Sequence, residues 1–248
     1  MFFHCLLFAE EPRTYPSKRA VFLEFLNFYE AIHPAQENNA DAYAWFSTVP
    51  NPFLNVVIHL STSDADARVD ELIQQNSPSN PMTFWVHPEN HVRGLADLLK
   101  KRNFHVLVTC PAMTWTVHPV PFCHADIRPA DQEIFWEIVS TVYELNEIAK
   151  KECPKLLDKL ECENYLFYSD GIPISTASLF VHGAVGEIFN DATLVEGGRA
   201  PKELMQFLMH RAHERGLERL IVLSYPEAEK SYQDLGFETL FDVEIYCR

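Results

Sequence analysis

The sequence predicts an α/β (α+β) protein, in which strands and helices alternate along most of the chain. Two observations carry this expectation. Residues 184–246 have the order strand, glycine turn, helix, strand, helix, strand, and residues 53–117 have the order strand, helix, strand, helix, strand. Helical patterns and a hairpin signal lie between these two stretches.

The N-terminal half opens with a helix over 17–32, whose apolar residues share one face. A polar stretch follows. The next segments alternate between strand and helix patterns: a strand over 53–60, a helix over 64–74, a strand over 82–88, a helix over 91–103, and one long strand or two paired strands over 104–117.

Three prolines within residues 118–129 predict a boundary between two domains, 1–120 and 121–248. Beyond it we expect helices over 134–143 and 154–160. A hairpin follows, whose two strands meet at Asp170 and Gly171, a pair typical of two-residue turns.

The last third of the chain is the most clearly punctuated. A strand over 184–194 precedes a glycine-containing turn and a helix over 201–216, which has proline in its first turn and glycine at its end. The remaining elements are a strand over 220–223, a helix over 226–235 and a strand over 239–246.

Composition narrows the possible partners and the location. The formal net charge of −15 argues against nucleic acid or an anionic membrane surface as partner and favours cationic substrates such as amines. The six cysteines show no CxxC pairing, as expected of reduced thiols in a cytoplasmic protein, and no metal site is predicted. The opening MFFHCLLFAEEP lacks the basic segment and cleavage site of a signal peptide, so we expect a buried edge there. No segment is long enough to span a bilayer, and the oligomeric state is not indicated.

Residues 184–237 resemble the GCN5-related N-acetyltransferases. The resemblance rests on an ATL-type strand end, a Gly-x-Ala turn, an amphipathic helix, and the segment SYPEAEKSYQDLGF, in which Tyr232 precedes Phe237 by five residues. With the preceding elements it covers about residues 123–248. It implies a mixed, mostly antiparallel sheet flanked by helices, and acetyl-CoA (CoA) as cofactor.

The N-terminal half resembles the reduced partner domain of two-domain members of that family. Asn103 falls where Gly236 does, while Leu99 takes the place of Tyr232. Asp64 and Asp66 stand where a phosphate turn would lie and would repel a pyrophosphate. The half is either a degenerate duplicate or a chance repetition of the same order.

The resemblance implies a CoA site at the glycine turn, because free N–H groups and the positive end of the following helix suit a pyrophosphate. The implied cofactor-binding residues are Thr193, Leu194, Val195, Gly197, Gly198, Arg199, Ala200 and Ser224.

For catalysis, the resemblance implies Tyr232 as the general acid that protonates the CoA thiolate. A phenol of pKa about 10 can give its proton to the thiolate of a thiol whose pKa is about 8.5. The alternative is a tyrosine that packs against the sheet. Glu187 is the candidate base; by the period of two it shares a strand face with Asp191, and either carboxylate could accept the amine proton. The alternative is a solvated strand carboxylate. A backbone N–H near Leu194 or Val195 could stabilise the carbonyl oxygen.

We therefore expect an acyl-CoA-dependent N-acyltransferase that carries acetyl groups to a small amine, catalytic in its C-terminal half. A second hypothesis is a non-catalytic CoA-binding or interaction module. It is favoured by Val195, which stands where the family has a basic residue, by Pro201, which removes one N–H from the phosphate turn, and by the short loop.

Overall fold

The computed structural model describes residues 18–32, 42–90, 92–121, 125–158, 160, 162–194 and 201–248. The apolar opening and the loop residues Val195, Gly197, Gly198, Arg199 and Ala200 lie outside these described residues. Within the described residues, no helix is both long and apolar enough to cross a membrane. Four of the six cysteines are described, and all four are free thiols: Cys110, Cys153, Cys162 and Cys247.

The N-terminal half contains α1 (Lys18–Ile32), β1 (Ala42–Phe46), the 3-10 turn η1 (Pro52–Leu54), β2 (Asn55–Leu60), α2 (Ala65–Gln75), β3 (Thr83–Val86), α3 (Leu95–Lys101) and β4 (His105–Thr116). Strand β1 lies in the polar stretch for which the sequence predicts no helix or strand. The strand expected from residue 53 begins at Asn55, because the Asn51 side chain accepts from the Phe53 N–H and caps a 3-10 turn. The helix expected from residue 91 begins at Leu95, after Gly94 in the left-handed conformation (φ 76°).

The C-terminal half contains β5 (Ile127–Pro129), α4 (Gln132–Val142), α5 (Glu147–Leu157), β6 (Cys162–Ser169), β7 (Ile172–His182), β8 (Val185–Thr193), α6 (Lys202–Glu214), β9 (Arg219–Leu223), α7 (Pro226–Asp234) and β10 (Glu238–Cys247). The prediction of a helix over 154–160 is wrong about where the helix begins. Helix α5 begins seven residues earlier, where Asn146 caps it by accepting from the Ala149 N–H, and Pro154 lies inside the helix. The hairpin turn is confirmed: Asp170 and Gly171 have φ of 51° and 79°.

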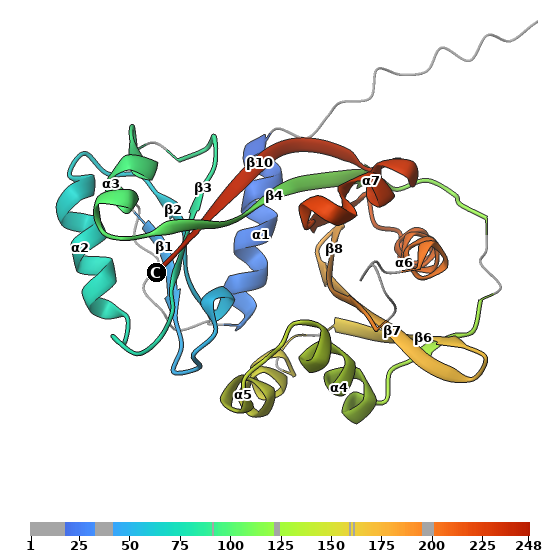
Figure 1. Cartoon of the computed structure of the whole chain (residues 1–248). Coiled ribbons are helices and arrows are strands. Elements are labelled where there is room, and N and C mark those ends of the chain that lie inside the picture. The colour runs from blue at the N-terminus through green and yellow to red at the C-terminus, as the bar shows by residue number, and fades with distance from the viewer. Residues whose placement is uncertain are drawn as a thin grey trace, which may run out of the picture.

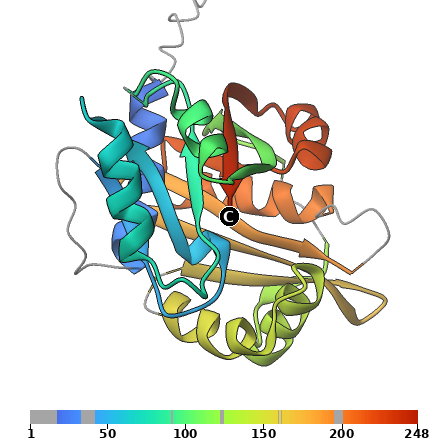
Figure 2. The ribbon, with the colours of Figure 1, turned by 60° about the vertical axis from the view of Figure 1, so that its left-hand side comes forward.

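In the part of the chain that the structure describes, ten strands form one sheet in the order β1-β2-β3-β10-β4-β9-β8-β7-β6-β5. Among these described strands, the pairs β2/β3 and β8/β9 are parallel, and the other pairs are antiparallel. The expected mixed, mostly antiparallel sheet flanked by helices is thereby confirmed. Helices α4 and α5 cover one face of β6, β7 and β8, and α6 covers the other (Figure 2).

Strands β4 and β10 run side by side between the two halves (Figure 1). In the N-terminal half, β2 and β3 form a parallel pair, and β3 lies next to β10 in the sheet. In the C-terminal half, β8 and β9 form a parallel pair, and β9 lies next to β4. Each strand-helix-strand-helix-strand unit thus places its last strand next to the other unit. The sheet is continuous across residue 120, and the division into domains 1–120 and 121–248 stays a prediction.

The ends of α3 and α7 match in detail. Asn103 (φ 64°) and Gly236 (φ 92°) are both left-handed. The next N–H turns back to the helix in both cases, from Phe104 to the Leu99 carbonyl (3.1 Å) and from Phe237 to the Tyr232 carbonyl (3.0 Å). Leu99 therefore holds the place of Tyr232, as the sequence predicts. This agreement supports the duplication hypothesis.

Helix α1 ties the two halves together. It contacts β7 and β8 of the C-terminal half, where Phe28 meets Phe180 and Phe189 at ring-centroid distances of 5.8 and 5.0 Å. Its Val21 and Phe25 belong to the same core cluster as Trp45 of β1. One hydrophobic core therefore spans both halves and brings α1 close to the end of β8.

Candidate functional site

Strands β8 and β9 separate part-way along their length. Their last paired residues are Ile188 and Val222. Strand β8 continues to Thr193 with only β7 as partner, while β9 ends at Leu223 and the chain turns into α7. An opening is therefore edged by the end of β8 on one side and the start of α7 on the other.

A β-bulge at Asn190 re-aims the side chains of β8. Asn190 has φ of 53°, and the register with β7 slips between Thr176 and Ser178. The Thr176 hydroxyl fixes the bulge by donating to the Asn190 carbonyl oxygen at 2.7 Å. A bulged residue reverses the alternation of faces beyond it. The expectation that Glu187 and Asp191 share a face is therefore wrong: Glu187 turns toward α1, and Asp191 toward α7.

The buried Tyr232 and the half-buried Asp191 form a hydrogen-bonded pair. The Tyr232 hydroxyl donates to Oδ2 of Asp191 at 2.8 Å, and the Tyr143 hydroxyl donates to the Asp191 carbonyl oxygen at 3.3 Å. Burial raises the pKa of Asp191 to about 6, and the hydrogen bond from Tyr232 opposes that rise. Burial, together with the Asp191 charge, places the pKa of Tyr232 well above its ordinary value.

Glu187 is buried rather than solvated. Its exposed fraction is 8%, and its Oε2 has no hydrogen-bond partner in the part of the chain that the structure describes. Burial raises the pKa of Glu187 well above its ordinary value, and the like charge of Glu24 on α1 raises it further. A carboxyl group in this state is a stronger base than a solvated one once it is ionised.

A cavity of about 370 Å³ lies between the two halves and reaches both carboxylates. Helix α1, turn η1 and strands β3 and β4 supply its wall on the N-terminal side. Helices α4 and α5 with their connection, the ends of β8 and β9, and strand β10 supply the wall on the C-terminal side. Glu187 and Asp191 therefore line one space although they point to different helices.

The described residues of the expected cofactor site are engaged within the fold. The Thr193 hydroxyl lies 2.7 Å from the Ser175 hydroxyl, and the buried Ser224 hydroxyl donates to the Tyr225 carbonyl oxygen at 2.9 Å. Leu194 is half exposed, but its N–H donates to the Ile174 carbonyl at 2.9 Å. The Leu194 N–H is therefore occupied by β7 and is not the free donor that the sequence suggested.

The N-terminal end of α6 follows directly on the undescribed loop. The first helical bond within α6 runs from the Leu204 N–H to the Pro201 carbonyl, which leaves the N–H groups of Lys202 and Glu203 without an intrahelical partner. Lys202 is exposed. A helix N-terminus with an exposed lysine in its first turn suits the phosphates of CoA, so the described residues fit the cofactor at this end.

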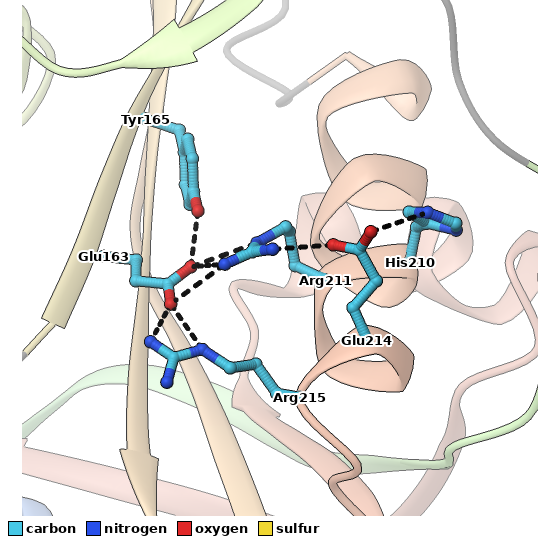
Figure 3. Close-up of polar contacts among 6 residues, drawn as sticks. All are labelled: Glu163, Tyr165, His210, Arg211, Glu214 and Arg215. Atoms are coloured by element: carbon cyan, nitrogen blue, oxygen red, sulfur yellow. Dashed lines mark hydrogen bonds and ion pairs between the residues drawn. The ribbon is translucent and has the colours of Figure 1, made fainter.

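A polar cluster anchors α6 to β6 (Figure 3). Glu163 of β6 accepts hydrogen bonds from Tyr165 and from two guanidinium groups. These belong to Arg211 of α6, at 3.2 Å, and to Arg215 just after α6, whose Nε lies at 2.6 Å. Burial alone would raise the pKa of Glu163, but these donors outweigh it and hold the pKa below its ordinary value. The cluster fixes the helix that follows residues 195–200 in the chain, and its pairing across 48 residues leaves no local signal in the sequence.

Known structures share this fold. The chain is similar to a GCN5-related N-acetyltransferase from Kribbella flavida, with a TM-score of 0.63 and 13% identity over 92% of this chain and 95% of that one. It is similar to another from Sphaerobacter thermophilus, with a TM-score of 0.62 and 11% identity over 91% and 84% of the two chains. The chain has the GCN5-related N-acetyltransferase fold.

The GCN5-related N-acetyltransferase fold extends over more of the chain than residues 123–248, on which the sequence resemblance rests, because the matched parts include the N-terminal half. A functionally unknown conserved protein from Staphylococcus epidermidis ATCC 12228 is also similar, with a TM-score of 0.61 and 10% identity over 86% of this chain and 92% of that one. No family model matches the chain, and no curated protein is significantly similar in sequence.

Proposed function

We propose that the protein is an acyl-CoA-dependent N-acyltransferase that moves an acetyl group from acetyl-CoA to a small amine, in a cytoplasmic setting. The observation that carries the proposal is the opening between β8 and β9, at which the Asp191–Tyr232 pair meets a cavity lined by a second carboxylate, which is buried. The acetyltransferase fold supports it, as does the N-terminus of α6.

The first-turn N–H groups of α6 and Lys202 would hold the phosphates, together with the loop residues that the sequence resemblance implies. When bound, acetyl-CoA supplies a thioester whose acyl carbon an amine can attack. The new C–N bond forms as the C–S bond breaks, so the amine must lose a proton and the sulfur must gain one.

Asp191 and Tyr232 are placed to move that proton. Asp191, with a pKa of about 6, would accept a proton from the attacking amine. Protonated Asp191 no longer repels a tyrosinate, and Tyr232 can then pass its own proton to the thiolate and recover one across the 2.8 Å hydrogen bond. This order matters because Tyr232 next to ionised Asp191 is a weaker acid than a free phenol. Glu187, the base expected from the sequence, lines the same cavity and stays a candidate for the first transfer.

The second candidate, a CoA-binding module without catalysis, rests on a specific observation: the hydroxyls of Thr193, Ser224 and Tyr232 are all engaged within the fold. One pair of measurements separates the two. An enzyme releases free thiol from acetyl-CoA in the presence of an amine, whereas a binding module is stabilised by CoA against heat without releasing thiol.

A matched pair of variants tests the cofactor site. Gly198→Asp should abolish the CoA-induced rise in melting temperature, because it puts a carboxylate where the resemblance implies phosphates. Ser63→Asp, at the equivalent turn of the N-terminal half, should leave that rise intact. A rise that survives in Gly198→Asp would show that CoA is not held at this loop.

A further inference from the structure

The cavity also indicates which amine the protein accepts. Resting on the proposed function, we propose that it takes an amine with an aromatic or otherwise apolar body and no carboxylate or phosphate, and that Glu187 holds the amine group.

The charge of the cavity wall favours a cation. The acidic side chains among the described lining residues are Glu144, Glu187 and Asp191, and these described lining residues include no lysine, arginine or histidine. Glu24 adds a further negative charge behind Glu187. A carboxylate or phosphate on the substrate would enter a poorly solvated space without a counter-charge, which is strongly unfavourable. Amino acids and phosphorylated amines are thereby disfavoured.

Glu187 lacks the partner that a buried carboxylate needs. Its Oε2 is shielded from solvent and has no hydrogen-bond partner among the described residues. Buried charges in proteins are paired, since an unpaired one forfeits its hydration. An ammonium group in the cavity supplies the opposite charge that Glu187 lacks among its described neighbours.

The remaining walls are largely apolar, and aromatic rings form part of them. Rings reach the cavity from five different elements or their ends: Phe28 of α1, Phe53 of η1, Trp85 of β3, Trp136 of α4 and Tyr225 at the start of α7. Such walls bind flat apolar groups and stabilise a nearby cation through their ring faces. The volume of about 370 Å³ lies within the range of small-molecule sites.

The position of Glu187 suits attack on an acyl group in the opening. Glu187 immediately precedes Ile188, the last β8 residue paired with β9, and Asp191 follows just beyond the bulge. An amine held by Glu187 therefore lies at the edge of the opening, within the same cavity as the carboxylate that would take its proton.

The test compares 2-phenylethylamine with L-phenylalanine, which differs by one carboxylate, and with spermidine. Thiol release from acetyl-CoA should give kcat/KM at least about 10-fold higher for 2-phenylethylamine than for either competitor. In the absence of acetyl-CoA, 2-phenylethylamine alone should raise the melting temperature. Glu187→Gln should abolish that rise and lower kcat/KM for 2-phenylethylamine on the order of 10²-fold, with the CoA-induced rise unchanged.

Glu187→Gln keeps the shape of the side chain and removes a buried charge, so its own melting temperature should be equal to or above that of the unaltered protein. Glu238→Gln, on an exposed part of β10, serves as the control and should change neither amine nor CoA binding. If 2-phenylethylamine raises the melting temperature but no amine releases thiol, the inference about which amine binds in the cavity stands, and the transferase proposal fails. If spermidine or L-phenylalanine is acetylated as well as 2-phenylethylamine or better, or if 2-phenylethylamine neither binds nor reacts, the substrate inference is overturned.

Discussion

The Tyr232 side chain has two roles to separate, because its hydroxyl both hydrogen-bonds a half-buried carboxylate and is the proposed proton donor. Tyr232→Phe keeps the ring, which packs against Phe237 at a centroid distance of 5.1 Å. The loss of the bond to Asp191 should lower the free energy of unfolding by about 1 kcal/mol. The loss of the proton should lower turnover on the order of 10²-fold with little change in the KM for acetyl-CoA.

Thiol release and the melting curve of this one variant decide between the roles. A protein that remains folded after losing about 1 kcal/mol keeps nearly all of its active molecules, so a purely structural tyrosine would leave turnover almost unchanged. Full activity in Tyr232→Phe would remove it from the proton path.

Asp191 should give the protein a measurable pH dependence of stability. Folding raises its pKa from 3.8 to about 6, so the folded state binds a proton more tightly than the unfolded state. Its stabilising contribution is therefore complete below about pH 4 and is lost as the pH rises through about 6. The difference corresponds to on the order of 3 kcal/mol.

Asp191→Asn removes this titration and keeps an acceptor for the Tyr232 hydroxyl. Denaturant unfolding at several pH values between 4 and 7 should show the unaltered protein losing stability relative to the variant as the pH rises. The low pKa of Glu163 affects both proteins equally. Parallel stability curves would mean that Asp191 titrates normally.

The attachment of α6 to β6 depends on Glu163, whose side chain is only 19% exposed and which pairs with both Arg211 and Arg215. Glu163→Gln should lower the free energy of unfolding by about 1.5–3 kcal/mol, since charge-assisted bonds to a half-buried carboxylate are lost. It should also weaken CoA binding, because in the proposed function the N-terminus of α6 holds the phosphates of CoA.

Glu214→Gln is the matched control within the same cluster. Glu214 pairs with Arg211 at 2.6 Å, but its side chain is 46% exposed, so its removal should cost less than about 1 kcal/mol. Thermal melts of both variants, with and without CoA, provide the comparison. Equal effects of the two substitutions would show that burial of Glu163 contributes nothing to the anchoring of α6.

Elements with strong local signals were predictable. Helix α6 was predicted from the proline at its start and the glycine at its end. The turn at Asp170 and Gly171 was predicted because these two residues favour the left-handed backbone conformation that they adopt. Strand β1 was missed because its five residues, AYAWF, carry too little periodicity beside a polar stretch.

The site itself was only partly predictable. The sequence pointed to Tyr232, Glu187 and Asp191, but the bulge at Asn190 that divides the two carboxylates has no local signal. Whether a strand carboxylate is buried or solvated depends on what packs over it, here α1, more than 150 residues away along the chain. Non-local pairing of this kind cannot be derived from local patterns.

The exchange of β4 and β10 has a consequence for the whole chain. Strand β10 bonds to β3 and β4, and β4 bonds to β9, so each half completes its sheet with a strand of the other. A fragment cut between residues 120 and 121 would expose unpaired strand edges and divide the core cluster that includes Phe25, Trp45 and Ile221.

We therefore expect that residues 1–120 and 121–248, produced separately, show no cooperative thermal transition, while the two produced together assemble into a 1:1 complex that melts cooperatively. The full chain should melt in one transition when followed both by far-ultraviolet and by near-ultraviolet circular dichroism. The physical reason is that the cavity, the shared core and the central strand pair all need both halves. A fragment that melts cooperatively by itself near the melting temperature of the full chain would show that its half is stable without the exchanged strand.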